Sequence, residues 1–201
     1  SGFEALGEIV AGTVNPSGKT SDTFVADLTA TPTWNNFGYF KYDNMDEYAY
    51  TSNNFKTGEE ETALPSFVNY VDGIYVGYRF YETAAAEGLI NYDDTVVYPF
   101  GYGLSYTTFT QEMGAISEDN GTISFDVTVT NTGDVAGKDV VEVYYNPPYT
   151  NGGIEKASAN LIQFEKTEVL QPGDSQTITV SFDAEDMASY DTYGAGCYVL
   201  E

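Results

Sequence analysis

Histidine is absent from this chain of 201 residues. The absence excludes a Ser–His–Asp triad, a histidine general base and a histidine-ligated metal site, because each of these needs an imidazole. Cysteine occurs once, as Cys197, so no internal disulfide bond can form and the redox compartment stays open. No other pattern of metal ligands is evident, so we expect neither a metal ion nor a cofactor.

Basic residues are scarce as well. Seven Lys and Arg residues stand against 31 Asp and Glu residues, which leaves a formal net charge of −24. So acidic a chain repels the phosphates of nucleic acids and of anionic membranes. Long apolar runs are also missing, since none approaches the ~20 residues of a membrane-spanning helix. We therefore expect no nucleic-acid partner and no membrane span.

Hydrophobic residues make up 42% of the chain, and in its second half they alternate with polar ones. The alternation is clear over residues 123–129 and 178–182, as in strands with one buried face. Asn120-Gly121 and the QPGD of residues 171–174 are typical of tight turns. Short strands separated by turns predict a mainly β fold with a β-sandwich of immunoglobulin type.

The first half of the chain is less regular. Residues 3–10 repeat apolar side chains at the spacing of a short helix, which Gly12 is expected to end. A long irregular connector follows. Within it, residues 70–81 are rich in β-branched and aromatic side chains and predict a strand. This segment holds Arg79, the single arginine, which we expect to form a structural ion pair with a carboxylate.

The segment PFGYGLSYTTF, residues 99–109, contains two glycines and joins the two halves of the chain. Its last six residues, 104–109, alternate and predict the first strand of the sandwich. The segment resembles the signature at which β-glucosidases and related enzymes of glycoside hydrolase family 3 enter a fibronectin type III-like domain. Further segments are similar to that family and occur in the expected order: FEALGEIVAGTVNPSGKTSDTF, DGIYVGYRFY, VTNTGDVAGKDVVEVYY, LQPGDSQTITVSF and MASYD.

The resemblance implies a domain order. Residues 1–24 would end an α/β sandwich domain, residues 25–103 would form a connector with one or two strands, and residues 104–201 would form the fibronectin-like domain. That domain's last strand is expected to be missing from this sequence. The parent would be a retaining glycosidase that cleaves β-linked glucosides or xylosides with two carboxyl groups.

The family's catalytic motifs are not found in this chain. Its nucleophile is an Asp followed by Trp, whereas the single tryptophan here, Trp34, follows Thr33. Its Lys-His motif is impossible without histidine, and its acid/base Glu lies upstream of this sequence. None of the 31 acidic residues matches a catalytic position, so we expect no catalytic residue and no activity from this chain alone.

Two hypotheses for function follow. The chain is either a C-terminal part that braces the catalytic domains of a β-glycosidase, or a free-standing carbohydrate-binding or adhesion module. In the first case its partners are the enzyme's other domains or a second copy, and the parent's substrate is an oligosaccharide or glycoside. Trp34 is the candidate for a sugar contact, although it would equally pin the connector to a neighbouring domain. The residues do not determine localisation. The resemblance favours a bacterial, secreted or cell-surface protein over a cytoplasmic one.

Overall fold

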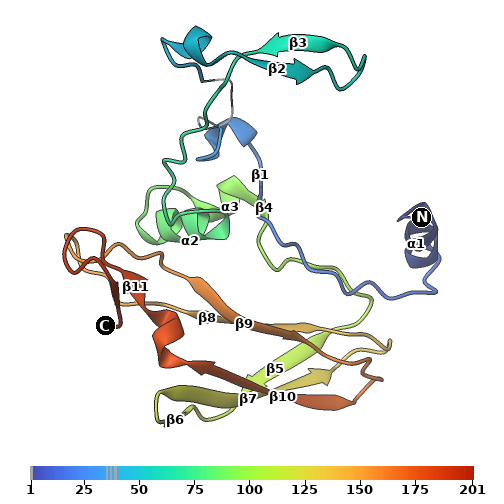
Figure 1. Ribbon diagram of the computed structural model, residues 1–201. Coiled ribbons are helices and arrows are strands. Elements are labelled where there is room, and N and C mark those ends of the chain that lie inside the picture. The colour runs from blue at the N-terminus through green and yellow to red at the C-terminus, as the bar shows by residue number, and fades with distance from the viewer. Residues whose placement is uncertain (1, 35, 37, 39) are drawn as a thin grey trace. The chain divides into compact units, whose positions relative to one another are not determined.

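A computed structural model describes residues 2–34, 36, 38 and 40–201 of the chain. Strands are more numerous than helices (Figure 1), which confirms the predicted mainly β fold. The elements, in chain order, are α1 Gly2–Val10, β1 Phe24–Val25, η1 Leu28–Ala30, η2 Met45–Tyr48, β2 Tyr50–Asn53, β3 Glu60–Ala63, α2 Tyr78–Ala86, α3 Tyr92–Thr95, β4 Val96–Tyr98, β5 Phe109–Met113, β6 Ser117–Asp119, β7 Thr122–Asn131, β8 Val140–Tyr145, β9 Asn160–Lys166, β10 Ser175–Asp183, η3 Ala184–Met187, β11 Ser189–Tyr190 and β12 Tyr198–Val199.

The chain divides into two compact units. The first joins Ser1–Ala26 to Gly77–Glu201 and contains the β-sandwich, and the second is Asp27–Val76. Within the second unit, β2 and β3 form an antiparallel hairpin, and the Phe67 ring contacts the rings of Phe40 and Tyr42. The assignment of residues 1–24 to an α/β domain and of residues 25–103 to a connector stays a prediction.

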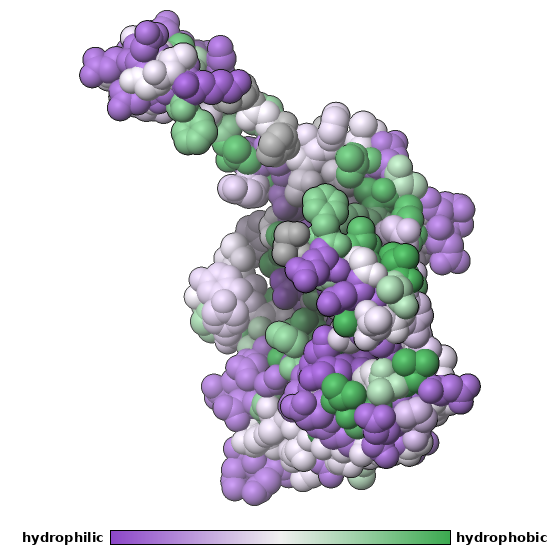
Figure 2. Space-filling model, turned by 90° about the vertical axis from the view of Figure 1, so that its right-hand side faces the viewer, coloured by the Kyte–Doolittle hydropathy of each residue, from purple (hydrophilic) through white to green (hydrophobic). Residues whose placement is uncertain are grey.

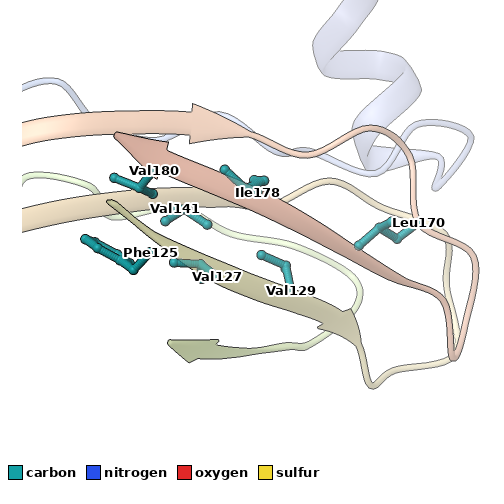
Figure 3. Close-up of a cluster of buried hydrophobic side chains, with 7 residues drawn as sticks. All are labelled: Phe125, Val127, Val129, Val141, Leu170, Ile178 and Val180. Atoms are coloured by element: carbon teal, nitrogen blue, oxygen red, sulfur yellow. The ribbon is translucent and has the colours of Figure 1, made fainter. Parts of the chain in front are cut away.

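Two sheets form the sandwich. One has the strand order β10-β7-β5 with β6 also paired to β7, and the other pairs β8 with β9. In the first sheet Val127 lies opposite Ile178 and Phe125 lies opposite Val180, so the inward positions of β7 and β10 meet. Figure 3 shows the resulting core between the sheets, which consists of Phe125, Val127, Val129, Val141, Leu170, Ile178 and Val180. The alternation of apolar and polar residues along β7 and β10 therefore places the apolar side chains on the buried face of the sheet.

Both predicted turns are confirmed. Asn120 and Gly121 have φ angles of 51° and 86° and join β6 to β7, as a two-residue hairpin turn with both central residues left-handed requires. In the second turn Gly173 has φ 84°, and Asp174 N donates to Gln171 O at 2.9 Å. Proline followed by a glycine with positive φ is the type II arrangement.

The strand predicted from residue 104 begins later, at Phe109 in β5. Residues 104–108 are not paired in a sheet because their polar groups have other partners. The Asn15 side chain accepts from Tyr106 N at 2.8 Å and from Ser105 Oγ at 3.1 Å. A long-range side-chain contact has therefore replaced the expected ladder.

The strand predicted over residues 70–81 is wrong. Gly77 has φ 61° and ψ −133°, a conformation open to glycine and not to L side chains, and α2 begins at the next residue. Tyr81 and Ala84, three residues apart, are buried on one face of α2. Helix α2 ends at Ala86, and Gly88 with φ 70° follows its end. The β-forming side chains are thus accommodated in a helix that packs by one face.

Helix α1 is confirmed, and Gly12 with φ 73° follows its end. None of its residues is buried, and the apolar side chains of Phe3, Leu6 and Val10 are 85%, 55% and 76% exposed. Other large apolar side chains also reach the surface, and Figure 2 shows hydrophobic residues among hydrophilic ones on one face. No helix in the described part of the chain is long and apolar enough to cross a membrane.

Candidate functional site

Two segments far apart in the sequence are held together in the first unit, and we call them the clasp (residues 15–20 and 99–106). Thr20 N donates to Tyr102 O at 2.8 Å, and Thr20 Oγ1 donates to Pro99 O at 2.6 Å. Tyr102 N in turn donates to Thr20 Oγ1 at 3.0 Å. One threonine therefore satisfies several backbone groups of the glycine-rich segment.

Asn15 fastens the other end of the clasp. Beside the bonds it accepts from residues 105 and 106, its Nδ2 donates to Ala136 O at 3.0 Å, in the loop before β8. The Tyr106 hydroxyl donates to Ile9 O at 2.7 Å, at the end of α1. The clasp thus connects α1 to the sandwich through the hydrogen bonds of Asn15 and Tyr106.

Glycines permit the closest approach inside the clasp. A Cβ at Gly103 would collide with the carbonyl oxygen of Gly18 and would lie 2.8 Å from Lys19 Cδ. A cavity of about 230 Å³ lies beside this contact, and its lining is mostly polar. Lys19 and Asp139 both line it and form an ion pair at 3.1 Å. Asp139 is the one carboxylate among the lining residues, and it is paired with Lys19. The cavity therefore lacks the two carboxyl groups of a glycosidase site.

Helix α2 is fixed to the sandwich at β9. Leu161 N donates to the Tyr78 hydroxyl at 2.7 Å, and Ser158 N donates to Thr83 Oγ1 at 3.0 Å. The Tyr78 ring also contacts Phe100 and Tyr144, with centroid distances of 4.7 and 5.9 Å. The start of α2, the clasp and β8 therefore form one continuous polar and aromatic surface.

Two tyrosine–carboxylate pairs occur near this surface. Tyr92 donates to Glu82 at 2.7 Å, and Tyr144 donates to Glu142 at 2.8 Å. Burial, followed by the hydrogen bond to the neighbouring carboxylate, raises the pKa of both phenols well above their usual range. Both tyrosines therefore act as hydrogen-bond donors. Their carboxylate partners are engaged in structural contacts.

Trp34, the predicted sugar contact, lies in the Asp27–Val76 unit and is 53% exposed. Its backbone N donates to Thr31 O at 3.1 Å. Its role in sugar binding stays a prediction. Among the described residues, no group of three or more carboxylate or thiol side chains is arranged to hold a metal ion.

The carboxylate partner expected for Arg79 is not found within the described residues of its compact unit. Its Nε is buried without a hydrogen-bond partner, and its guanidinium carbon lies 5.8 Å from the centroid of the Tyr78 ring. The expected structural ion pair of Arg79 is therefore not confirmed by the described residues of this unit. The sequence analysis also did not predict the clasp. Asn15 and Thr20, two polar residues at the ends of a turn that contains Pro and Gly, could have indicated it.

Comparison with known proteins identifies relatives for nearly the whole chain. The model of the fibronectin type III-like domain matches residues 139–201. β-Glucosidase A of Butyrivibrio fibrisolvens is 38% identical over 205 residues, which cover 94% of this chain and 21% of the relative. A β-glucosidase of Ruminococcus albus is 35% identical over 193 residues, which cover 96% and 17%. The chain therefore spans about a fifth of the length of these relatives.

Solved structures give the same result. A β-glucosidase from Paenibacillus barengoltzii superposes with a TM-score of 0.74 at 34% identity, over 98% of this chain and 18% of that protein. β-Glucosidase 3B from Thermotoga neapolitana superposes with a TM-score of 0.69 at 33% identity, over 92% and 22%. The similarity includes the clasp segments as well as the sandwich, because it extends over almost all of this chain.

Proposed function

Because this chain belongs to the C-terminal region of the glycoside hydrolase family 3 β-glucosidases, with its fibronectin type III-like domain, we propose that it is the non-catalytic brace of a longer retaining β-glycosidase. The relatives are about five times as long as this segment. The catalytic carboxyl groups would lie in the remaining domains. The names of the relatives favour a β-glucoside as the parent's substrate.

The observation that carries this proposal is the exposed apolar face of α1. A helix of nine residues is marginal in water unless one face packs against something. Phe3, Leu6 and Val10 present that face, and Tyr106 ties the end of α1 to the sandwich. The clasp would therefore transmit the rigidity of the sandwich to α1, and α1 would pack on a neighbouring domain of the parent.

The purified 201-residue chain is expected to show no turnover of an aryl β-glucoside, because it lacks a matched acid and nucleophile. Release of nitrophenol from p-nitrophenyl β-D-glucoside measures this directly. The full-length parent serves as the positive control, and the parent without these residues should lose activity or stability. Turnover by the isolated chain well above buffer would exclude the non-catalytic role.

The exposed indole of Trp34 supports a second candidate function, that of a carbohydrate-binding module. Isothermal titration of the chain with cello- and xylo-oligosaccharides separates the two candidates. A bracing segment gives no saturating heat. Saturable binding that disappears in Trp34→Ala and persists in Tyr193→Ala, another exposed aromatic residue, would favour the module.

A further inference from the structure

Arg79 is the one cationic side chain of its unit without an acceptor among the described residues. Lys19 and Lys138 pair with Asp139 and Glu168, at 3.1 and 3.4 Å. Lys156 contacts the Glu201 carboxylate, and Lys166 donates to the carbonyl oxygen of Ser17 at 2.7 Å. The arginine, with its buried Nε, is therefore the exception in an acidic chain.

Two acidic side chains, one on α2 and one on β8, already accept hydrogen bonds from tyrosines. Glu82 on α2 accepts from Tyr92, and Glu142 on β8 accepts from Tyr144. On β8, burial raises the pKa of Tyr145 and the positive charge of Arg79 opposes that rise. The guanidinium thus lies within electrostatic reach of Tyr145 at the end of β8.

An unpaired guanidinium in this position is costly. An arginine side chain, unlike a lysine, does not lose its charge on burial. The Nε of Arg79 is buried and has no hydrogen-bond partner. The two terminal nitrogens of the guanidinium are not among the atoms buried in this way. The planar fork of an arginine matches the two oxygens of one carboxylate.

We propose that Arg79 is an interdomain contact residue, which receives an Asp or Glu side chain from another domain of the parent polypeptide. The guanidinium carbon lies 5.8 Å from the centroid of the Tyr78 ring, a cation–π distance that favours this position of the side chain. The proposal rests on the proposed function, because only the longer parent supplies that carboxylate. Beside the exposed apolar face of α1, Arg79 at the start of α2 would be a second contact with the other domains of the parent.

The test uses the full-length parent with Arg79→Lys, treated with a carbodiimide that couples an amine to a carboxylate in contact with it. We expect a peptide containing residue 79 joined to an Asp- or Glu-containing peptide from outside residues 1–201, in the monomer band. The exposed Lys138–Glu168 pair is the internal positive control. A partner within residues 1–201, a product only in a dimer band, or no product while the control pair couples would each overturn the proposal.

A second variant tests the contact where the lysine introduced by Arg79→Lys does not reach the partner carboxylate. Arg79→Gln in the parent is expected to lower the melting temperature by several degrees, whereas Lys138→Gln, which removes a surface pair, changes it by less than about 1 °C. Equal melting temperatures for the two variants would contradict the interdomain contact. This result is distinct from failure of the bracing role, which would appear as activity of the isolated chain.

Discussion

Replacement of Asn131 by alanine is expected to lower the free energy of unfolding by about 3–5 kcal/mol. Asn131 is fully buried at the end of β7. Its Oδ1 accepts from Thr107 Oγ1 at 2.6 Å and from Gly133 N at 3.1 Å, and its Nδ2 donates to the carbonyl oxygens of Val135 and Leu170, each at 2.9 Å. Alanine would remove the Asn131 partner from all four groups, and the bonds to Thr107 and Leu170 are buried.

Equilibrium unfolding in urea, followed by circular dichroism, measures the loss as a shift of the midpoint at constant slope. Asn146→Ala is the matched control, because this exposed side chain makes a single hydrogen bond, to Ser158 O. We expect a loss of about 1 kcal/mol or less for the control. Equal losses for the two variants would mean that the Asn131 network does not stabilise the sandwich.

The second large effect is expected at Gly103. An alanine there would force the Gly18 carbonyl and the Lys19 side chain to move, which we expect to cost about 1–3 kcal/mol. The displacement would also disturb the Thr20 hydrogen bonds that fasten the clasp, so residues 1–20 should become sensitive to protease. Limited proteolysis followed by mass spectrometry locates the first cleavage.

Gly18→Ala is the control for this experiment. Its new Cβ would meet nothing within 4 Å, although Gly18 is the residue that Gly103 touches. The control variant should keep the stability and the cleavage pattern of the unaltered chain. Early cleavage before residue 20 in both variants, or in neither, would show that close packing at Gly103 does not hold the clasp.

The second half of the fold was predictable because its information is local. Along β7 the side chains alternate between the core and the outside, and this period of two is visible in the residues themselves. The turns at Asn120-Gly121 and at Gly173 need positive φ, which few residues adopt. Local chemistry and global fold agree there, so the sequence pattern and the structure coincide.

The missed features depend on distant partners. Residues 78–81 have strand-forming side chains, yet burial of one helical face and the φ of Gly77 place them in α2. The contact of Asn15 with Tyr106 joins residues 91 positions apart, and no periodicity reports such a pair. The sequence also did not show that Arg79 has no carboxylate partner among the described residues of its unit.

The clasp also has a consequence for the order of folding. Its hydrogen bonds close loops of 79 residues between Thr20 and Pro99 and of 97 residues between Ile9 and Tyr106, whereas a two-residue turn joins β6 to β7. Closing a long loop costs more chain entropy, and distant contacts slow folding. We therefore expect the sandwich hairpins to form first and the clasp to close last. During synthesis, residues 1–20 would leave the ribosome before residue 106 and would stay undocked until residue 106 had emerged and the sandwich had begun to form.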